Sequence, residues 1–225
     1  MIIVRYKEIG IKGNNRRDFE KQLQLNIKHA LKKNSIPFKE VIRVRGRIII
    51  NTEEKVPQLK NIFGISSFSY TKKYYLDLDE IKKGALDHYE KGSFRITCRR
   101  GKKIFSSSVE LGRDIGAFVV EHTGAEVDLH TADTEIFIEL LEDGAYIYTT
   151  KIKGPGGLPV GVEPRIVLLL QDQKSVKAGI EVMKRGCRVD IVKEKDINYS
   201  ELEEYVFGYT IQEFDSIPED CFALV

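Results

Sequence analysis

RIVLLLQDQKSVKAGIEVMKRG, residues 165–186, joins an apolar run to an amphipathic helix through a short polar turn. The apolar run at 166–170 predicts a strand that is buried on both faces, as in a parallel sheet. The predicted helix ends at Gly186, and a second strand follows at 187–192. A strand, a helix and a further strand in this order predict an α/β unit.

The turn at 170–175 is where such a unit binds phosphate, because free N–H groups at a helix start point toward it. Close approach of the backbone to a pyrophosphate usually requires glycine. The turn here reads Leu-Gln-Asp-Gln-Lys-Ser and contains no glycine. The sequence therefore predicts the scaffold of a nucleotide site without its phosphate cradle.

A linker and a second unit precede this stretch. Residues 154–164, GPGGLPVGVEP, hold three of the six prolines and four glycines, which predicts a linker. Upstream, the pattern predicts a helix at 79–91, a strand at 94–99, a helix at 107–122 that opens with a capping box, and a hairpin that turns at 142–144.

The first part of the chain predicts a small α+β unit. Its elements are a strand at 2–6, a helix at 15–33 with one apolar face, a short helix around 55–63 and a strand around 67–75.

Residues 40–50, EVIRVRGRIII, allow two interpretations. As a single strand, their alternation places Arg43, Arg45 and Arg47 on one face. With Gly46 at the turn of a hairpin, the three arginines instead gather near its tip. Both interpretations predict a cluster of positive charge.

The formal net charge of +2 conceals a strong asymmetry between the two halves of the chain. Residues 1–110 carry 25 Lys/Arg and 12 Asp/Glu, whereas residues 111–225 carry 11 and 22. Such a basic half predicts a polyanionic partner, and nucleic acid is the leading candidate. The alternative is that the two halves neutralise each other across an interface.

Cellular location and metal content are predicted by what the sequence lacks. It begins without a signal-peptide pattern and contains no apolar run of membrane-spanning length, so we expect a cytoplasmic protein without a membrane partner. Its three cysteines, Cys98, Cys187 and Cys221, form neither a CxxC nor a zinc pattern. We therefore expect reduced thiols and no metal site.

Several motifs carry a family resemblance. VRYKEIGIKGNNRRDFEKQLQLNI (4–27) resembles the opening of the 4-thiouridine synthetases, also called tRNA sulfurtransferases. RVRGRIII (43–50), RITCRRGKKIFSSS (95–108), YIYTTKIKGPGGLPVG (146–161) and MKRGCRV (183–189) continue the match in the same order. The resemblance covers nearly the whole chain.

The resemblance implies three domains of mixed α+β and α/β class. They are a ferredoxin-like domain at 1–72, a THUMP RNA-binding domain at 73–155, and a truncated Rossmann-like parallel α/β segment at 164–225 that corresponds to the family's pyrophosphate-loop domain. It also implies that the first two domains together bind the acceptor region of a tRNA.

Similar enzymes carry Ser-Gly-Gly-x-Asp-Ser in the pyrophosphate loop. Aligned on MKRG, this chain differs at four of the five defined positions, which are Leu170, Gln171, Asp172 and Lys174. Only Ser175 is kept, and the sequence that follows is much shorter than in the family. The resemblance thus implies a degenerate, shortened domain with Lys174 and Ser175 as remnant nucleotide contacts. We expect no cofactor; ATP and magnesium would be needed only if the loop still works.

A candidate sulfur residue lies at the end of the chain. IPEDC (217–221) resembles a cysteine-bearing segment of the family's adenylating domain, which makes Cys221 a candidate for sulfur transfer. Glu219 and Asp220 would raise the pKa of that thiol and so oppose the reactive thiolate. We assign no other catalytic residue.

Basic side chains in the first two domains are the candidate phosphate contacts. Arginine suits this role because its planar fork binds phosphate bidentately, and A-form stems are recognised mainly by shape. The candidate RNA-binding residues are Lys12, Asn14, Arg16, Arg17, Arg43, Arg45, Arg47, Arg95, Arg99, Arg100, Lys102 and Lys103.

Three functions are compatible with the sequence. The first is a tRNA-binding protein of this lineage that lacks adenylation activity and recruits tRNA for a partner modification enzyme. The second is an active ATP-dependent tRNA sulfurtransferase that makes 4-thiouridine and supplies sulfur for the thiamine thiazole. The third is an interaction protein whose acidic C-terminal half binds another protein or forms a homodimer.

Overall fold

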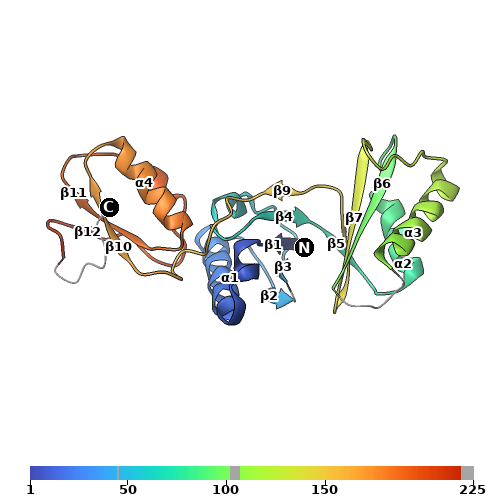
Figure 1. The fold of residues 1–225 in the computed structure, drawn as a ribbon, viewed down its shortest axis with the longest axis horizontal. Coiled ribbons are helices and arrows are strands. Elements are labelled where there is room, and N and C mark those ends of the chain that lie inside the picture. Colours follow the sequence, from blue (N-terminus) through green and yellow to red (C-terminus); the bar gives the residue numbers. More distant parts are fainter. Residues whose placement is uncertain (45, 102–106, 219–225) are drawn as a thin grey trace. The chain divides into compact units, whose positions relative to one another are not determined.

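The computed structural model describes residues 1–44, 46–101 and 107–218. The chain divides into two compact units, one made of Met1–Ile3 with Ser69–Lys151 and the other of Val4–Phe68 with the residues from Ile152 onward. Figure 1 shows three sheets with their helices. Within the described residues, every helix is too short or too polar to cross a membrane.

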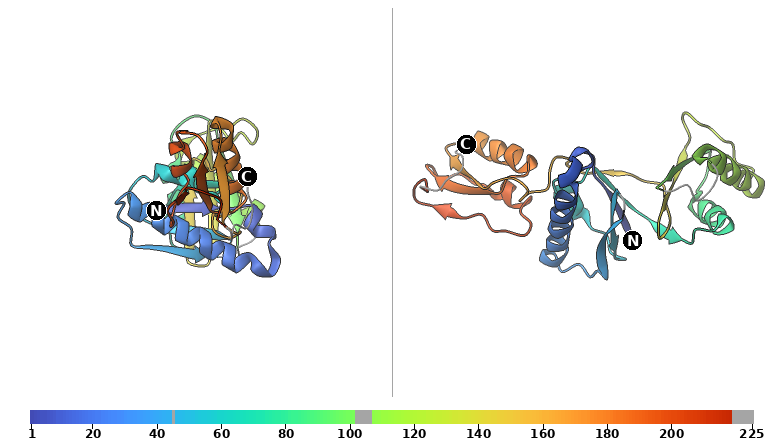
Figure 2. Two further views of the ribbon diagram at one scale, coloured as in Figure 1. Left: turned by 90° about the vertical axis from the view of Figure 1, so that its left-hand side faces the viewer. Right: turned by 60° about the horizontal axis from the view of Figure 1, so that its bottom comes forward.

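The first sheet has the strand order β2-β3-β1-β4-β9. Helix α1 (Arg16–Lys33) runs along one face of this sheet (Figure 2) and buries Phe19, Leu23 and Ile27 against it, so the predicted helix is confirmed. The other elements are β1 (Ile2–Arg5), η1 (Glu8–Ile11), η2 (Gly13–Asn15), β2 (Glu40–Val44), β3 (Arg47–Asn51), η3 (Pro57–Asn61), β4 (Ser67–Tyr70) and β9 (Ile152–Lys153).

Residues 40–50 form a hairpin, so the single-strand interpretation is wrong. Gly46 adopts a φ of +77°, a conformation that favours glycine and allows the tight turn. Arg43 lies opposite Ile48, and Val44 lies opposite Arg47. Because neighbouring residues of a strand point to opposite faces, Arg43 and Arg47 lie on opposite faces of the hairpin.

The predicted strand at 67–75 is also two strands. β4 belongs to the first sheet, and β5 (Lys72–Tyr74) belongs to a second sheet of order β5-β8-β7-β6. Single-sequence alternation cannot distinguish one long strand from two short ones that join different sheets. The boundary between the two units falls at this point in the chain.

The second sheet carries two helices over a shared apolar core. Ile81 of α2, Leu111 and Ile115 of α3, and Ile136 and Ile138 of the sheet are all buried in it. The predicted capping box is confirmed, since the Ser107 and Glu110 side chains each bond the other residue's backbone N–H. The elements are α2 (Leu78–His88), β6 (Phe94–Arg100), α3 (Ser108–Thr123), β7 (Thr134–Leu141) and β8 (Gly144–Tyr148).

The third sheet confirms the predicted α/β unit. Strands β10 (Ile166–Leu170), β11 (Val189–Lys193) and β12 (Glu213–Phe214) are parallel and in that order. Helix α4 (Gln173–Lys184) follows β10, and α5 (Ser200–Glu203) is a single turn.

The proline- and glycine-rich segment at 154–163, here called the connector, is packed rather than a free linker. The Gly156 carbonyl accepts from the Gly64 N–H at 2.7 Å, and the Leu158 N–H donates to the Lys184 carbonyl at 2.9 Å. Gly157 adopts a φ of +73°, and a Cβ there would lie 2.3 Å from the Lys184 oxygen. The glycines of the connector therefore allow its backbone to contact both the loop before β4, at Gly64, and the end of α4, at Lys184.

Candidate nucleic-acid interface

Five of the predicted RNA-binding residues gather where α1 begins. We call Lys12, Asn14, Arg16, Arg17 and Arg43 the helix-start cluster. Lys12 lies between η1 and η2, Asn14 lies in η2, and Arg16 and Arg17 begin α1. The β2–β3 hairpin supplies Arg43. The Arg43 guanidinium donates to the Arg17 carbonyl at 3.2 Å. Asn14, Arg17 and Arg43 are exposed, so a charged ligand can reach them.

Arg16 is held in place by its neighbours. Its Nε donates to Glu20 Oε1 at 2.7 Å, and its Nη2 donates to the Tyr6 hydroxyl at 3.1 Å. Tyr6 also donates to Glu20. Burial and this hydrogen bond to Glu20 raise the pKa of Tyr6 to about 12. Tyr6, Arg16 and Glu20 therefore hold one another in place beside the more exposed Arg17.

The remaining arginines of the hairpin do not all join this cluster. Arg47 lies on the opposite face of the hairpin from Arg43, and its guanidinium donates to the Gly46 carbonyl at 2.6 Å. Arg45 lies outside the described residues.

A second group of predicted contacts lies on β6, in the other unit. Arg95 donates to Glu135 at 2.5 Å and to the Leu129 carbonyl at 3.1 Å, so it ties β6 to its neighbours. Burial alone would raise the pKa of Glu135, but hydrogen bonds from Thr97 and Arg95 lower it below its usual value. An RNA phosphate at Arg95 would therefore share the guanidinium group with the Glu135 carboxylate.

The other two β6 arginines differ in exposure. Arg99 is exposed, whereas Arg100 is half-buried and its Nε donates to Ser108 Oγ at 3.0 Å. We call Arg95, Arg99 and Arg100 the strand cluster; alternation along β6 places Arg95 and Arg99 on one face of the strand and Arg100 on the other. Lys102 and Lys103, which follow it in the sequence, lie outside the described residues.

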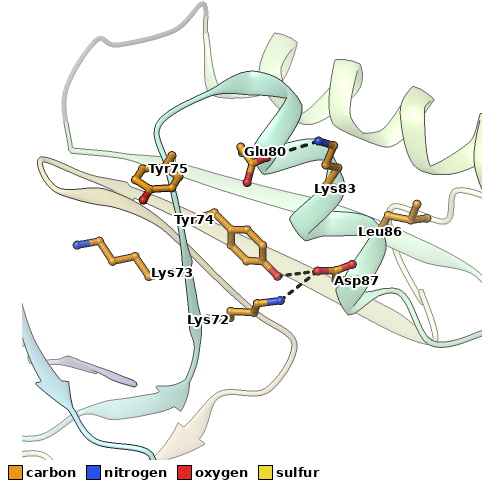
Figure 3. Close-up of a pocket in the computed structure, with 8 residues that line it drawn as sticks. All are labelled: Lys72, Lys73, Tyr74, Tyr75, Glu80, Lys83, Leu86 and Asp87. Atoms are coloured by element: carbon orange, nitrogen blue, oxygen red, sulfur yellow. Dashed lines mark hydrogen bonds and ion pairs between the residues drawn. The ribbon is translucent and has the colours of Figure 1, made fainter.

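A pocket rich in lysine and tyrosine was missed by sequence reasoning (Figure 3). Tyr75 is 81% exposed at its rim. Each lysine in this region lies beside a carboxylate: Lys72 and Asp87 at 3.2 Å, Lys83 and Glu80 at 3.5 Å, and Lys73 and Asp143 at 2.6 Å. These pairs offset the positive charge locally, so the pocket is a weaker phosphate site than the helix-start cluster.

The turn between β10 and α4 is closed by the protein's own carboxylate. Asp172 Oδ1 accepts from the N–H groups of Lys174 and Ser175 at 2.8 and 3.1 Å. The hydrogen bond from the Ser175 N–H is the largest cause that lowers the pKa of Asp172, and the one from the Lys174 N–H lowers it further. The Gln171 N–H is directed to Ser175 Oγ at 3.3 Å. The Asp172 carboxylate thus caps the start of α4.

Neither described cysteine favours a thiolate. Burial raises the pKa of Cys98 to about 12, and burial together with Glu163 raises the pKa of Cys187. Cys221 lies outside the described residues. Within the described ranges, no group of three or more His, Cys, Asp or Glu side chains is arranged to hold a metal ion.

Family models match most of the chain. The ThiI ferredoxin-like domain matches residues 1–69, and the THUMP domain matches residues 75–150. The first range holds α1 and most of the first sheet, without β9, and the second holds α2, α3 and most of the second sheet, without β5.

Curated proteins described as tRNA sulfurtransferases are similar to this chain in sequence. A protein of Thermococcus kodakarensis described as "Probable tRNA sulfurtransferase" is 36% identical over 232 residues, covering 92% of this chain and 61% of the relative. A protein of Moorella thermoacetica with the same description is 37% identical, covering 82% of this chain and 50% of the relative. The chain therefore spans about half to three-fifths of the length of these relatives.

Two solved structures extend the match. PH1313 from Pyrococcus horikoshii Ot3 is 37% identical with a TM-score of 0.85, covering 96% of this chain and 78% of that one. A 4-thiouridine synthetase crystallised with RNA and bound ATP is 32% identical with a TM-score of 0.71, covering 85% and 52%. On these matches and its two family domains, the chain belongs to the 4-thiouridine synthetase, or tRNA sulfurtransferase, family.

Proposed function

We propose that this chain binds the acceptor region of tRNA through the helix-start cluster and the strand cluster, and that the turn at 170–175 does not adenylate RNA. The helix-start cluster carries the proposal, because its Arg17 and Arg43 side chains are exposed to solvent. Arg43 is held by its hydrogen bond to the Arg17 carbonyl, and neighbouring Arg16 is held by Glu20. A pre-ordered set of guanidinium groups loses little side-chain freedom when it binds phosphate. A cytoplasmic location belongs to the same proposal.

The binding half of the proposal is tested with a fluorescent tRNA acceptor stem over a series of salt concentrations. Affinity should fall linearly with salt on a log–log scale, with a slope near −0.7 to −0.9 per neutralised phosphate. The double change Arg17→Ala and Arg43→Ala should reduce that slope by roughly one to two and weaken binding, since it removes two candidate phosphate contacts.

A matched control is Lys177→Ala, which removes an exposed charge from α4 outside both clusters. It should leave the slope and the affinity close to those of the unchanged protein. Equal loss in both variants would contradict a specific interface at the helix-start cluster.

The second candidate function is an active ATP-dependent sulfurtransferase. It is favoured by the parallel β10–α4–β11 unit, which keeps Lys174 and Ser175 at the helix start, and by the ATP bound in the solved relative. The two functions are separated by pyrophosphate release from ATP in the presence of tRNA. We expect none, because Asp172 competes with phosphate for the same N–H groups. Release that is lost in Lys174→Ala would establish the enzyme instead.

The proposed partners are tested by oligomeric state. A homodimer, or capture of tRNA for a separate modification enzyme, would both suit a chain that binds RNA without reacting on it. Sedimentation of the full chain with and without tRNA distinguishes a dimer from a monomer that binds one RNA.

A further inference from the structure

An apolar groove separates β6 from α3 in the unit that contains Ser69–Lys151. Four aliphatic side chains on its walls are unusually open to solvent, with Val109 71%, Val120 36%, Val127 45% and Leu129 67% exposed. Scattered exposed aliphatic residues are ordinary, but four that line one groove form a patch of the kind that binds another molecule. None of them has a role in the proposed RNA contacts.

Among the described residues, β6 is the edge strand of its sheet, and its outer edge runs along this groove. In the β6–β7 pair, the Gly101 N–H bonds the Leu140 carbonyl and the Ser93 carbonyl accepts from Thr134, so the odd-numbered residues direct their backbone groups toward β7. Backbone groups alternate along a strand. Those of Ile96 and Cys98 therefore point away from β7, toward the groove.

The chain itself shows that this edge can pair. The Phe94 N–H donates to the Glu126 carbonyl at 2.9 Å, and the Asp128 N–H donates to the Phe94 carbonyl at 3.0 Å. Residues 126–128 thus form a single parallel bridge with β6 through Val127. Beyond Phe94, the described part of the chain supplies no strand to continue it.

Two glycines of α3 line the groove and face β6. A Cβ on Gly112 would lie 3.8 Å from Cys98 Sγ, and one on Gly116 would lie 3.9 Å from Ile96 Cγ1. Both are ordinary van der Waals distances, so the backbone of α3 approaches the side chains of β6 closely at these two positions. An edge strand beside a helix with a groove between them is the arrangement that receives an extended peptide by strand addition.

The charges at the groove are polarised along its length. Exposed Arg113 lies near the start of α3, and exposed Glu121 lies near its end. The start of the helix adds a partial positive charge at the Arg113 end. A ligand with an acidic group at that end would complement both, whereas a polyanion along the whole groove would meet Glu121.

We propose that this groove binds an extended segment of a partner protein. The segment adds as a strand to the outer edge of β6, hydrogen bonding to the backbone of Ile96 and Cys98. Alternate apolar side chains enter the groove, and an acidic residue faces Arg113. RNA is the less suitable occupant because the groove is lined mainly by aliphatic side chains and carries one cation and one carboxylate on its helix wall.

The experiment is a selection of random twelve-residue peptides displayed on phage against the full chain. Enriched peptides should alternate apolar residues and carry Asp or Glu toward one end. They should bind at least about tenfold more weakly to the double variant Val120→Asp and Leu129→Asp, in which desolvated carboxylates oppose an apolar ligand. The matched control is Ile217→Asp, which changes an aliphatic residue of 50% exposure outside the groove and should leave binding unchanged.

Hydrogen exchange supplies the second readout. A bound synthetic copy of an enriched peptide should slow exchange at the amides of Ile96 and Cys98, which point to the open edge. The same measurement is made with a single-stranded RNA twelve-mer. Failure to enrich any peptide, binding that ignores the groove variant, or protection of these amides by the RNA alone would each overturn the proposal.

Discussion

One buried amide adds to the hydrogen bonds that hold the connector, and its loss should loosen the connector without unfolding the rest of the chain. Asn26 of α1 is 2% exposed. Its Nδ2 donates to the Val160 carbonyl at 3.0 Å, and its Oδ1 accepts from Gln22 at 2.9 Å. Asn26→Ala leaves the buried Val160 carbonyl without this donor, which costs about 1–3 kcal/mol.

This cost should appear as faster amide exchange in the connector. The Leu158 N–H bonds Lys184 and the Gly161 N–H bonds Gly186, so both exchange only when the connector opens. A loss of 1–3 kcal/mol corresponds to roughly 5- to 150-fold faster opening of this segment. Residue-resolved exchange in the full chain measures it directly.

Two controls define what the result means. Gln22→Ala keeps the Asn26–Val160 hydrogen bond, so it should accelerate exchange much less than Asn26→Ala. The amide of Ile138, which lies in β7 of the other unit, should be unaffected by either change. The reasoning fails if exchange in the connector is unchanged, or if Ile138 accelerates to the same extent.

Three further predictions concern Tyr6, the two described cysteines and Gly157. Stability should fall as pH rises from about 10 to about 12, because the pKa of Tyr6 is 10.0 when unfolded and about 12 when folded; Tyr6→Phe should lose less stability over this window in chemical unfolding at each pH. Iodoacetamide should modify Cys187 before Cys98, whose pKa burial raises to about 12, and peptide mass spectrometry gives the order. Gly157→Ala should lower the thermal midpoint by calorimetry, with a cost above about 1 kcal/mol, since it strains a φ of +73° and places a Cβ 2.3 Å from the Lys184 oxygen; an unchanged midpoint would contradict a packed connector.

The elements that were predicted correctly have local causes. The α3 start is determined by side chains three residues apart, Ser107 and Glu110, which the sequence displays directly. The helix at 15–33 and the β10–α4–β11 unit follow in the same way from apolar periodicity within one segment. In these cases the physical determinant and the sequence signal coincide.

The errors have long-range causes. The connector has the composition of a flexible linker, but its order depends on Asn26 and Lys184, which are far away in the sequence. The pairing of Arg95 with Glu135 depends on the register of β6 and β7, which the sequence does not display. The Arg16–Glu20 pair, by contrast, has the i,i+4 spacing of a helical ion pair and was visible in principle.

For the candidate site, the sequence predicted the types of residue better than their arrangement in space. The sequence indicated which basic residues to consider, and the structure separates them by position. Arg17, Arg43 and Arg99 are exposed, whereas Arg16 and Arg95 are engaged with carboxylates. The β6–α3 groove had no sequence signal, because its walls come from three segments whose proximity only the fold establishes.

The packed connector changes how this protein should be dissected. A boundary between expressed fragments placed at 154–164 would follow composition, yet it would cut through backbone pairing on both sides of the cut. It would also separate Phe63 from Tyr205, whose rings stack with centroids 4.8 Å apart, and leave apolar surface on both fragments. Fragments meant to isolate RNA binding should therefore keep residues 152–218 with the first sheet, and insertions or tags belong elsewhere.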